Sequence, residues 1–335
     1  MKASELRQHS LDGLVDVERP RPTVGPRDVL VRMRAVGLNY RDLAIVRGEY
    51  GNYKLPLILT CDGAGEVVEV GAQVTRFAVG DRVLPIYVLD WISGPPDEPL
   101  LKRRLGGPID GLLADLVAVS EDSAVKAPDG LSDAEAAVLG VAAGTAWRAL
   151  FVNAQLAPGQ TVLVQGTGGV ALAALQLARM AGADVIVTSR SAAKLERVSR
   201  LGATHGVLTS SDDWPAQVLA LTGGRGADVT VDVAGGKGLN RSITATRLGG
   251  TVALLGFLES TTAPLDVTLA IRRSVAIRAS TGVSRSDLES ASRAYAAAGV
   301  KPIIDELYPR ARLREAFDRL AAGPFGKIAV TWAPR

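Results

Sequence analysis

The stretch Thr161-Val-Leu-Val-Gln-Gly-Thr-Gly-Gly-Val-Ala171 decides the fold of this chain of 335 residues. Its apolar residues 162–164 predict a buried parallel strand, and an alanine- and leucine-rich helix is predicted to follow. Gly166 permits a tight turn, Gly168 removes a side chain that would block phosphates, and Ala171 lets helix and strand pack closely. Amides at the helix start then face an anion. The sequence therefore predicts a dinucleotide-binding turn whose contacts come from Gly166, Thr167, Gly168, Gly169 and Val170.

The end of the next predicted strand, residues 184–188, indicates which dinucleotide is bound. An NAD site carries an acidic residue about 20 residues past the glycines, where it binds the ribose 2′-hydroxyl. This chain has Ser189 and Arg190 there, with Lys194 one turn further on. Hydroxyl donors and a guanidinium suit a 2′-phosphate, which a carboxylate would repel. NADPH is therefore the predicted cofactor; the alternative is that Arg190 and Lys194 form an ordinary solvated helix start.

Composition narrows the function classes. Hydrophobic residues make up 47% of the chain, and the net charge of +3 is spread along it. The densest basic run, residues 102–104, is too short to indicate nucleic-acid binding. No apolar run reaches membrane-spanning length, and the polar N-terminus lacks a signal-peptide core, so a cytoplasmic location is expected.

Metal ligands are scarce in this sequence. The single cysteine, Cys61, rules out an internal disulfide, and His9 and His205 are the two histidines. Catalytic zinc needs three protein ligands and structural zinc usually four, so no metal is expected, with carboxylates left as possible additional ligands.

The pattern along the chain predicts two domains. Roughly the first 120 residues show short β-rich runs between turn signals, which indicates a compact, partly barrel-like β domain. Residues 91–108 are expected to form an extended loop. From residue 123 onward strands alternate with helices, which predicts an α/β domain with a doubly wound parallel sheet. We expect its six strands at residues 161–165, 184–188, 206–208, 228–232, 251–256 and 275–279.

With these parts placed, the chain resembles the medium-chain dehydrogenase/reductase superfamily, on its zinc-free quinone-oxidoreductase side, over essentially its whole length. The resemblance is carried by residues 37–43, 47–51, 56–71, 79–83, 142–147, 164–171, 226–232 and 325–330. It implies a Rossmann dinucleotide-binding domain over residues 123–282. It also implies a GroES-like, β-barrel-type catalytic domain built from residues 1–122 and 283–335.

The departures from zinc-dependent relatives are as informative as the matches. Those relatives carry a cysteine in the early loop where this chain has Asn39, and Gly-His-Glu where it has Thr60, Cys61 and Asp62. They also carry four cysteines in a lobe where this chain has the 91–108 segment. Both zinc sites are therefore expected to be missing, and with them the Lewis acid that alcohol chemistry uses.

The resemblance implies hydride transfer from a nicotinamide to a conjugated acceptor, an α,β-unsaturated carbonyl compound or a quinone. Tyr50 falls where enoyl-reductase relatives place a proton-donating tyrosine. Asn39 and Tyr40 lie on the loop that replaces the zinc cysteine, and Asn39 is a candidate donor to the acceptor oxygen. The predicted catalytic residues are therefore Tyr50, Asn39 and Tyr40, with proton delivery by solvent as the alternative.

Further cofactor contacts follow from the resemblance. Thr145, expected to begin a helix, matches a residue that touches the nicotinamide amide. Arg285 resembles an arginine that reaches the cofactor phosphates, and Lys327 matches a lysine near the cofactor. Ala234 and Gly256 follow predicted strands and are expected to line the nicotinamide half, unless they are ordinary loop residues.

Two other functions remain open from the sequence. One is a metal-free NADP-dependent alcohol or carbonyl oxidoreductase, and the other is a non-catalytic NADPH-binding scaffold or sensor. The expected partners are a small-molecule substrate and further copies of the chain in a homodimer or homotetramer, with neither nucleic acid nor membrane.

Overall fold

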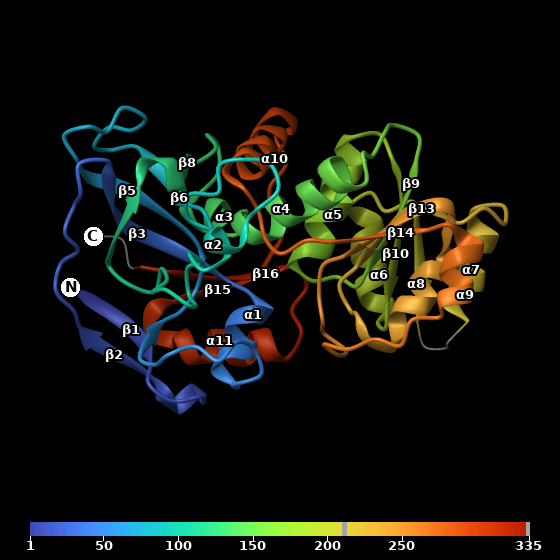
Figure 1. The fold of residues 1–335 in the computed structure, drawn as a ribbon, viewed down its shortest axis with the longest axis horizontal. Coiled ribbons are helices and arrows are strands. Elements are labelled where there is room, and N and C mark those ends of the chain that lie inside the picture. Colours follow the sequence, from blue (N-terminus) through green and yellow to red (C-terminus); the bar gives the residue numbers. More distant parts are fainter. Residues whose placement is uncertain (210–212, 333–335) are drawn as a thin grey trace. The chain divides into compact units, whose positions relative to one another are not determined.

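The computed structural model describes residues 1–209 and 213–332 and divides into two compact units (Figure 1). The first unit consists of Met1–Gly144 with Gly282–Arg335, and the second is the continuous segment Thr145–Thr281. The first unit is therefore assembled from both ends of the chain.

The second unit contains a parallel sheet of six strands within the described residues, in the order β11-β10-β9-β12-β13-β14. The predicted doubly wound α/β sheet is thereby confirmed. Its strands are β9 (Thr161–Gln165), β10 (Asp184–Ser189), β11 (His205–Leu208), β12 (Ala227–Asp232), β13 (Thr246–Leu254) and β14 (Ala276–Ala279). Its helices are α5 (Gly169–Met180), α6 (Ala192–Arg200), α7 (Trp214–Leu221), α8 (Leu239–Ala245) and α9 (Val267–Arg273).

The core of this unit explains the apolar runs of its strands. A parallel sheet is covered on both faces, so its central strands are apolar throughout rather than alternating. Accordingly, all six residues of β12 are buried, and β9 is buried after its first residue. One cluster packs Leu163 and Ile186 against Trp214 and Val218 of α7. The central strands are thus fixed, and with them the turns at their carboxyl ends.

The first unit is dominated by a sheet in the order β15-β16-β3-β5-β6-β8, with β7 also paired to β3. These strands are β3 (Asp28–Leu38), β5 (Asp62–Val70), β6 (Arg82–Pro85), β7 (Leu116–Ser120), β8 (Ala124–Lys126), β15 (Ile304–Pro309) and β16 (Lys327–Thr331). A smaller sheet joins β1 (Lys2–Leu6), β2 (Leu14–Glu18) and β4 (Leu57–Ile58). Its helices are α1 (Tyr40–Val46), α2 (Glu98–Leu101), α3 (Asp133–Ala137), α10 (Arg285–Ala298) and α11 (Leu313–Ala321), and α4 (Gly140–Trp147) crosses the boundary between the units.

Two expectations about the first unit are wrong. Tyr40 lies not on a loop but in α1, whose start is stabilised because the Asp42 carboxylate accepts the backbone N–H of Asn39 at 2.8 Å. The 91–108 segment is not loop throughout, because Asp97 caps the short helix α2 through the N–H of Leu100. Both helices are too short to produce a helical period in the sequence.

Among residues 1–209 and 213–332, no helix is long and apolar enough to cross a membrane.

Candidate functional site

The turn between β9 and α5 has the geometry of an anion cradle. Gly166 adopts a φ of +78°, which favours glycine, and Gly168 stands just before the first helical residue. The helix makes its first backbone bond from Leu172 to the carbonyl of Gly168 at 2.9 Å, so the earlier amides point out of its N-terminus. A Cβ placed on Gly168 would meet nothing within 4 Å. The residues around this turn therefore fit a bound diphosphate.

The end of β10 lies against this turn. The Gly166 N–H donates to the carbonyl of Thr188 at 2.8 Å, which brings the two strand ends together. Ser189 is buried and its hydroxyl accepts the N–H of Ser191, while Arg190 is exposed. Ser191 caps α6 through the N–H of Lys194 at 3.4 Å. A hydroxyl on the last residue of β10 and a guanidinium on the next residue thus stand where an NAD site has its carboxylate.

A buried polar network shapes the next turn, after β12. Asp232 is fully buried, and one of its oxygens accepts the N–H groups of Ala234 and Gly235, each at 2.9 Å. Its other oxygen accepts the Ser242 hydroxyl at 2.7 Å, and Ser242 in turn accepts from the Gln165 amide. The network fixes the backbone at Ala234 and was not predicted from the sequence. An aspartate that ends a strand before small residues is the signal that could have indicated it.

Two other predicted cofactor residues lie in the second unit. Gly256 approaches the turn so closely that a Cβ there would stand 2.2 Å from the carbonyl oxygen of Val233. Thr145 is buried, but the expectation that it begins a helix is wrong, because α4 starts at Gly140.

In the first unit, Lys327 holds Asn39 and Asp62 together. The Lys327 ammonium donates to Asn39 Oδ1 at 2.7 Å and to Asp62 Oδ2 at 3.1 Å. Asn39 Nδ2 donates to the same Asp62 oxygen at 2.9 Å. The side chains of Lys327 and Asp62 are 6% and 0% exposed, so the ion pair is shielded from water. We call this set the Lys327 cluster.

The second oxygen of Asp62 is also used. It accepts the N–H of Val141 at 2.7 Å, in the first turn of α4, where a carboxylate is favoured by the helix dipole. Gly140 makes room for it, because a Cβ at that position would lie 2.3 Å from Asp62 Oδ1. Asp62 thus receives three hydrogen bonds in a buried position, which tie α4, Asn39 and Lys327 to one carboxylate.

The residues of the Lys327 cluster do not fit a zinc ion. The resemblance places zinc ligands where this chain has Asn39 and Cys61, and zinc binds thiolate, imidazole or carboxylate. Burial raises the pKa of the Cys61 thiol well above its ordinary value, which disfavours the thiolate. The Lys327 ammonium already bonds Asp62 and would repel a dication. Within the described part of the chain, no group of three or more His, Cys, Asp or Glu side chains is arranged to hold a metal.

Next to this cluster, Arg41 is surrounded by aromatic rings. Its Cζ lies 5.6 Å from the ring centroid of Tyr50, 5.7 Å from that of Tyr53 and 5.1 Å from that of Tyr87. On the same helix, Asp42 is completely buried, and burial raises its pKa to about 6. No sequence pattern indicates a role for Arg41.

The remaining predicted residues have clear positions. Tyr40 is half-buried at the first position of α1. Arg285 begins α10 in the first unit, where its guanidinium donates to Asp122 Oδ1 at 2.7 Å and lies 3.6 Å from Glu289. The cofactor contacts expected of Arg285 and Lys327 stay predictions.

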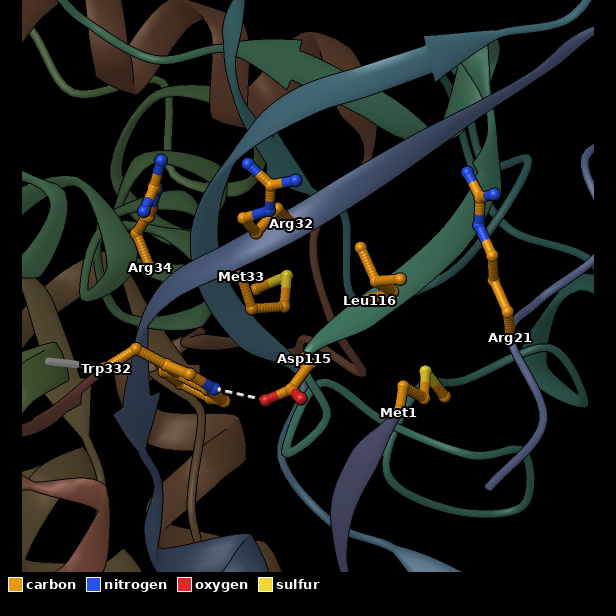
Figure 2. Close-up of a pocket in the computed structure, with 8 residues that line it drawn as sticks. All are labelled: Met1, Arg21, Arg32, Met33, Arg34, Asp115, Leu116 and Trp332. Atoms are coloured by element: carbon orange, nitrogen blue, oxygen red, sulfur yellow. Dashed lines mark hydrogen bonds between the residues drawn. The ribbon is translucent and has the colours of Figure 1, made fainter. Parts of the chain in front are cut away.

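A cavity of about 360 Å³ opens beside β3, at the point where this strand exchanges β7 for β16 as its partner (Figure 2). Trp332 donates from its indole to Asp115 at 3.0 Å, and Arg34 pairs with Glu66 at 2.6 Å. The lining residues are Met1, Arg21, Arg32, Met33, Arg34, Asp115, Leu116 and Trp332. None of them is a predicted site residue, so we do not assign the cavity to the reaction.

Comparison with known families and proteins gives consistent matches. Residues 25–129 match a family described as the alcohol dehydrogenase GroES-like domain, and residues 169–297 match one described as zinc-binding dehydrogenase. A zinc-type alcohol dehydrogenase-like protein of Schizosaccharomyces pombe is 36% identical over 92% of this chain and 91% of its own length.

Two further matches cover most of the chain. An acryloyl-coenzyme A reductase of Metallosphaera sedula is 30% identical over 91% of each chain. The crystal structure of a putative alcohol dehydrogenase from Sinorhizobium meliloti superposes with a TM-score of 0.93, at 39% identity, covering 99% of this chain and 98% of that one.

Proposed function

This chain belongs to the medium-chain dehydrogenase/reductase superfamily, and within it we propose a metal-free, NADPH-dependent reductase of α,β-unsaturated carbonyl compounds or quinones. Membership makes it an NAD(P)-dependent oxidoreductase. The choice of acceptor, the choice of NADPH and the independence from zinc are our proposals.

The observation that carries the proposal is the Lys327 cluster. The Lys327 ammonium bonds Asn39, one of the two positions where the resemblance places a zinc ligand, and Asp62, the neighbour of the other position, Cys61. Without a Lewis acid, the alkoxide formed by reducing a simple ketone would lack its main stabilisation. A conjugated acceptor spreads the same charge over several atoms, so hydrogen bonding and one proton suffice. The 30% identical relative named as an acryloyl-coenzyme A reductase supports this choice, since acryloyl thioesters are conjugated.

NADPH is favoured by the last residue of β10, Ser189, and by Arg190 directly after it. When bound, the reduced nicotinamide supplies the hydride. The amides at the start of α5 bind its diphosphate in this proposal, and Ser189 and Arg190 bind the 2′-phosphate. The Asp232 network holds Ala234 in place for the nicotinamide half.

In the first unit, each candidate residue takes a distinct role in the proposal. Tyr50 donates the proton from its phenol. The amide of Asn39 is oriented by its hydrogen bonds with Lys327 and Asp62. Tyr40, the first residue of α1, is the third candidate to contact the acceptor. Asp42 fixes the start of the helix that carries them.

The test uses purified protein treated with a chelator. Zinc content is measured by mass spectrometry, and NADPH and NADH oxidation are followed with a conjugated enone, a quinone and the matching saturated ketone. We expect turnover of the enone or the quinone, preference for NADPH and no requirement for zinc. Stoichiometric zinc whose removal abolishes activity would overturn the metal-free assignment.

The same assay separates the second candidate, a metal-free NADP-dependent alcohol or carbonyl oxidoreductase. The relatives named as alcohol dehydrogenases favour it, and it predicts reduction of the saturated ketone at least as fast as that of the enone. Tight NADPH binding without turnover of any acceptor would instead indicate a scaffold or sensor. The homodimer or homotetramer and the cytoplasmic location stay predictions.

A further inference from the structure

Arg41 connects two distant segments of the first unit. One is residues 47–54, which carry Tyr50 and Tyr53, and the other is the loop formed by residues 105–107. The guanidinium faces both tyrosine rings and donates hydrogen bonds to the carbonyls of Leu105 at 3.3 Å, Gly106 at 3.1 Å and Gly107. The Arg41 side chain therefore links residues 47–54 to residues 105–107, which are far apart in the sequence.

Glycines allow this close approach. Gly107 has a φ of +123°, and a Cβ there would stand 2.7 Å from the Tyr53 ring and 3.1 Å from an Arg41 nitrogen. A Cβ on Gly51 would lie 2.4 Å from the Tyr53 ring. Both positions thus require glycine, and both lie where the segments fold towards the guanidinium.

The surroundings keep Arg41 charged. Burial alone would lower its pKa, but Tyr87, Cys61 and Asp42 nearby raise it above its ordinary value. A guanidinium is attracted to the face of an aromatic ring, and more strongly when the contact is removed from water. The tyrosine-bearing segment is mostly exposed otherwise, and these contacts join it to α1.

We propose that Arg41 is the positioning residue for Tyr50. This inference rests on the proposed function, in which Tyr50 protonates the carbanion that hydride addition leaves on the acceptor. In that step the phenol O–H bond breaks, a C–H bond forms on the acceptor, and the electron pair stays on the phenol oxygen. Arg41 holds the ring in place through its contact with the aromatic face, and solvent then returns a proton to the phenol oxygen.

A double-mutant cycle tests the proposal, with kcat measured for an enone at saturating NADPH. We expect Tyr50→Phe and Arg41→Gln each to lower kcat about 100-fold, the range of general-acid catalysis. Because Arg41 acts through Tyr50, the double variant should lie within about 2-fold of Tyr50→Phe alone. The KM for NADPH should not change. Arg41→Lys, which keeps the charge, should recover part of the loss.

Arg76→Gln is a matched control in the same unit. Arg76 lies 5.1 Å from the Phe77 ring centroid and also donates to two backbone carbonyls, those of Glu121 and Ala124, but it does not face Tyr50. Its effect on kcat should be equal in the wild-type and Tyr50→Phe backgrounds. Equal effects of Arg41→Gln in both backgrounds would overturn the proposal.

A second measurement does not depend on turnover. Lys54 is exposed, and we expect Arg41→Gln to accelerate trypsin cleavage after it at least about 10-fold under native conditions. Arg76→Gln should leave that cleavage rate unchanged. If the wild type reduces neither enones nor quinones, the proposed function fails, and the cleavage rate alone decides whether Arg41 fixes the segment. An unchanged rate would then overturn the inference.

Discussion

Replacing Lys327 with methionine tests the Lys327 cluster most directly, because it removes the ammonium while keeping a side chain of similar length. Lys327 Nζ lies 3.1 Å from Asp62 Oδ2, and the two side chains are 6% and 0% exposed. Leaving a buried carboxylate without its counter-charge lowers the free energy of unfolding by about 3–5 kcal/mol. Since 1 kcal/mol corresponds to roughly 2–4 °C for domains of this size, the melting temperature of the first unit should fall by roughly 6–20 °C.

Calorimetry of the whole chain measures this shift. The matched control is Lys126→Met, because Lys126 is 68% exposed and lies 3.5 Å from Asp81. The free energy of unfolding of that variant should fall by at most about 1 kcal/mol. Adding Asp62→Asn to Lys327→Met should restore part of the stability, because no unpaired charge then remains.

One result would refute this reasoning. If the Lys327→Met and Lys126→Met variants have the same melting temperature, the Lys327 ammonium does not compensate the buried charge of Asp62. Lys327 would then not serve as the cation that takes the place of a metal beside Asp62.

Three further predictions concern the second unit. Arg190→Ala should weaken NADPH binding about 10- to 150-fold in calorimetric titration, the loss expected for one charge-assisted hydrogen bond, and leave NADH nearly unchanged; equal losses would contradict the 2′-phosphate assignment. Gly168→Ala should melt like the wild type, since its Cβ meets no protein atom, yet bind NADPH at least about 10-fold more weakly; unaltered binding would place the diphosphate elsewhere. Burial alone would raise the pKa of Asp228, but hydrogen bonds from Arg225, Thr161 and Arg247 lower it from 3.8 to about 2. Because the pKa of Asp228 is lower in the folded than in the unfolded chain, its carboxylate adds about 2 kcal/mol to the free energy of unfolding above pH 4. This contribution is lost as the pH falls towards 2. Asp228→Asn should therefore flatten stability between pH 4 and 2 in acid titrations, and an unchanged slope would exclude Asp228 as its source.

Local sequence patterns predicted the second unit well. Apolar runs, glycine turns and helical periods each extend over a few neighbouring residues, and the strand β9 and helix α5 follow from them directly. The helix α1 was missed because seven residues between two strands show no readable period.

The details of the candidate site depend on contacts that no local pattern carries. Lys327 is 265 residues from Asp62 in the sequence, and Arg41 is 64 to 66 residues from the carbonyls that it binds. The sequence singled out Asn39 and Tyr50 through resemblance, but it did not indicate which cations hold their surroundings together. Only the packing of β16 and of the 105–107 loop brings those charges into place.

The position of Lys327 in the last strand also affects how the protein is made. During translation, Asn39 and Asp62 leave the ribosome early, whereas the lysine that neutralises Asp62 arrives 265 residues later. A nascent or truncated chain that ends before β16 already has every glycine of the cofactor turn. It nevertheless lacks the ammonium that bonds Asp62, so the Lys327 cluster is completed only when synthesis is almost finished.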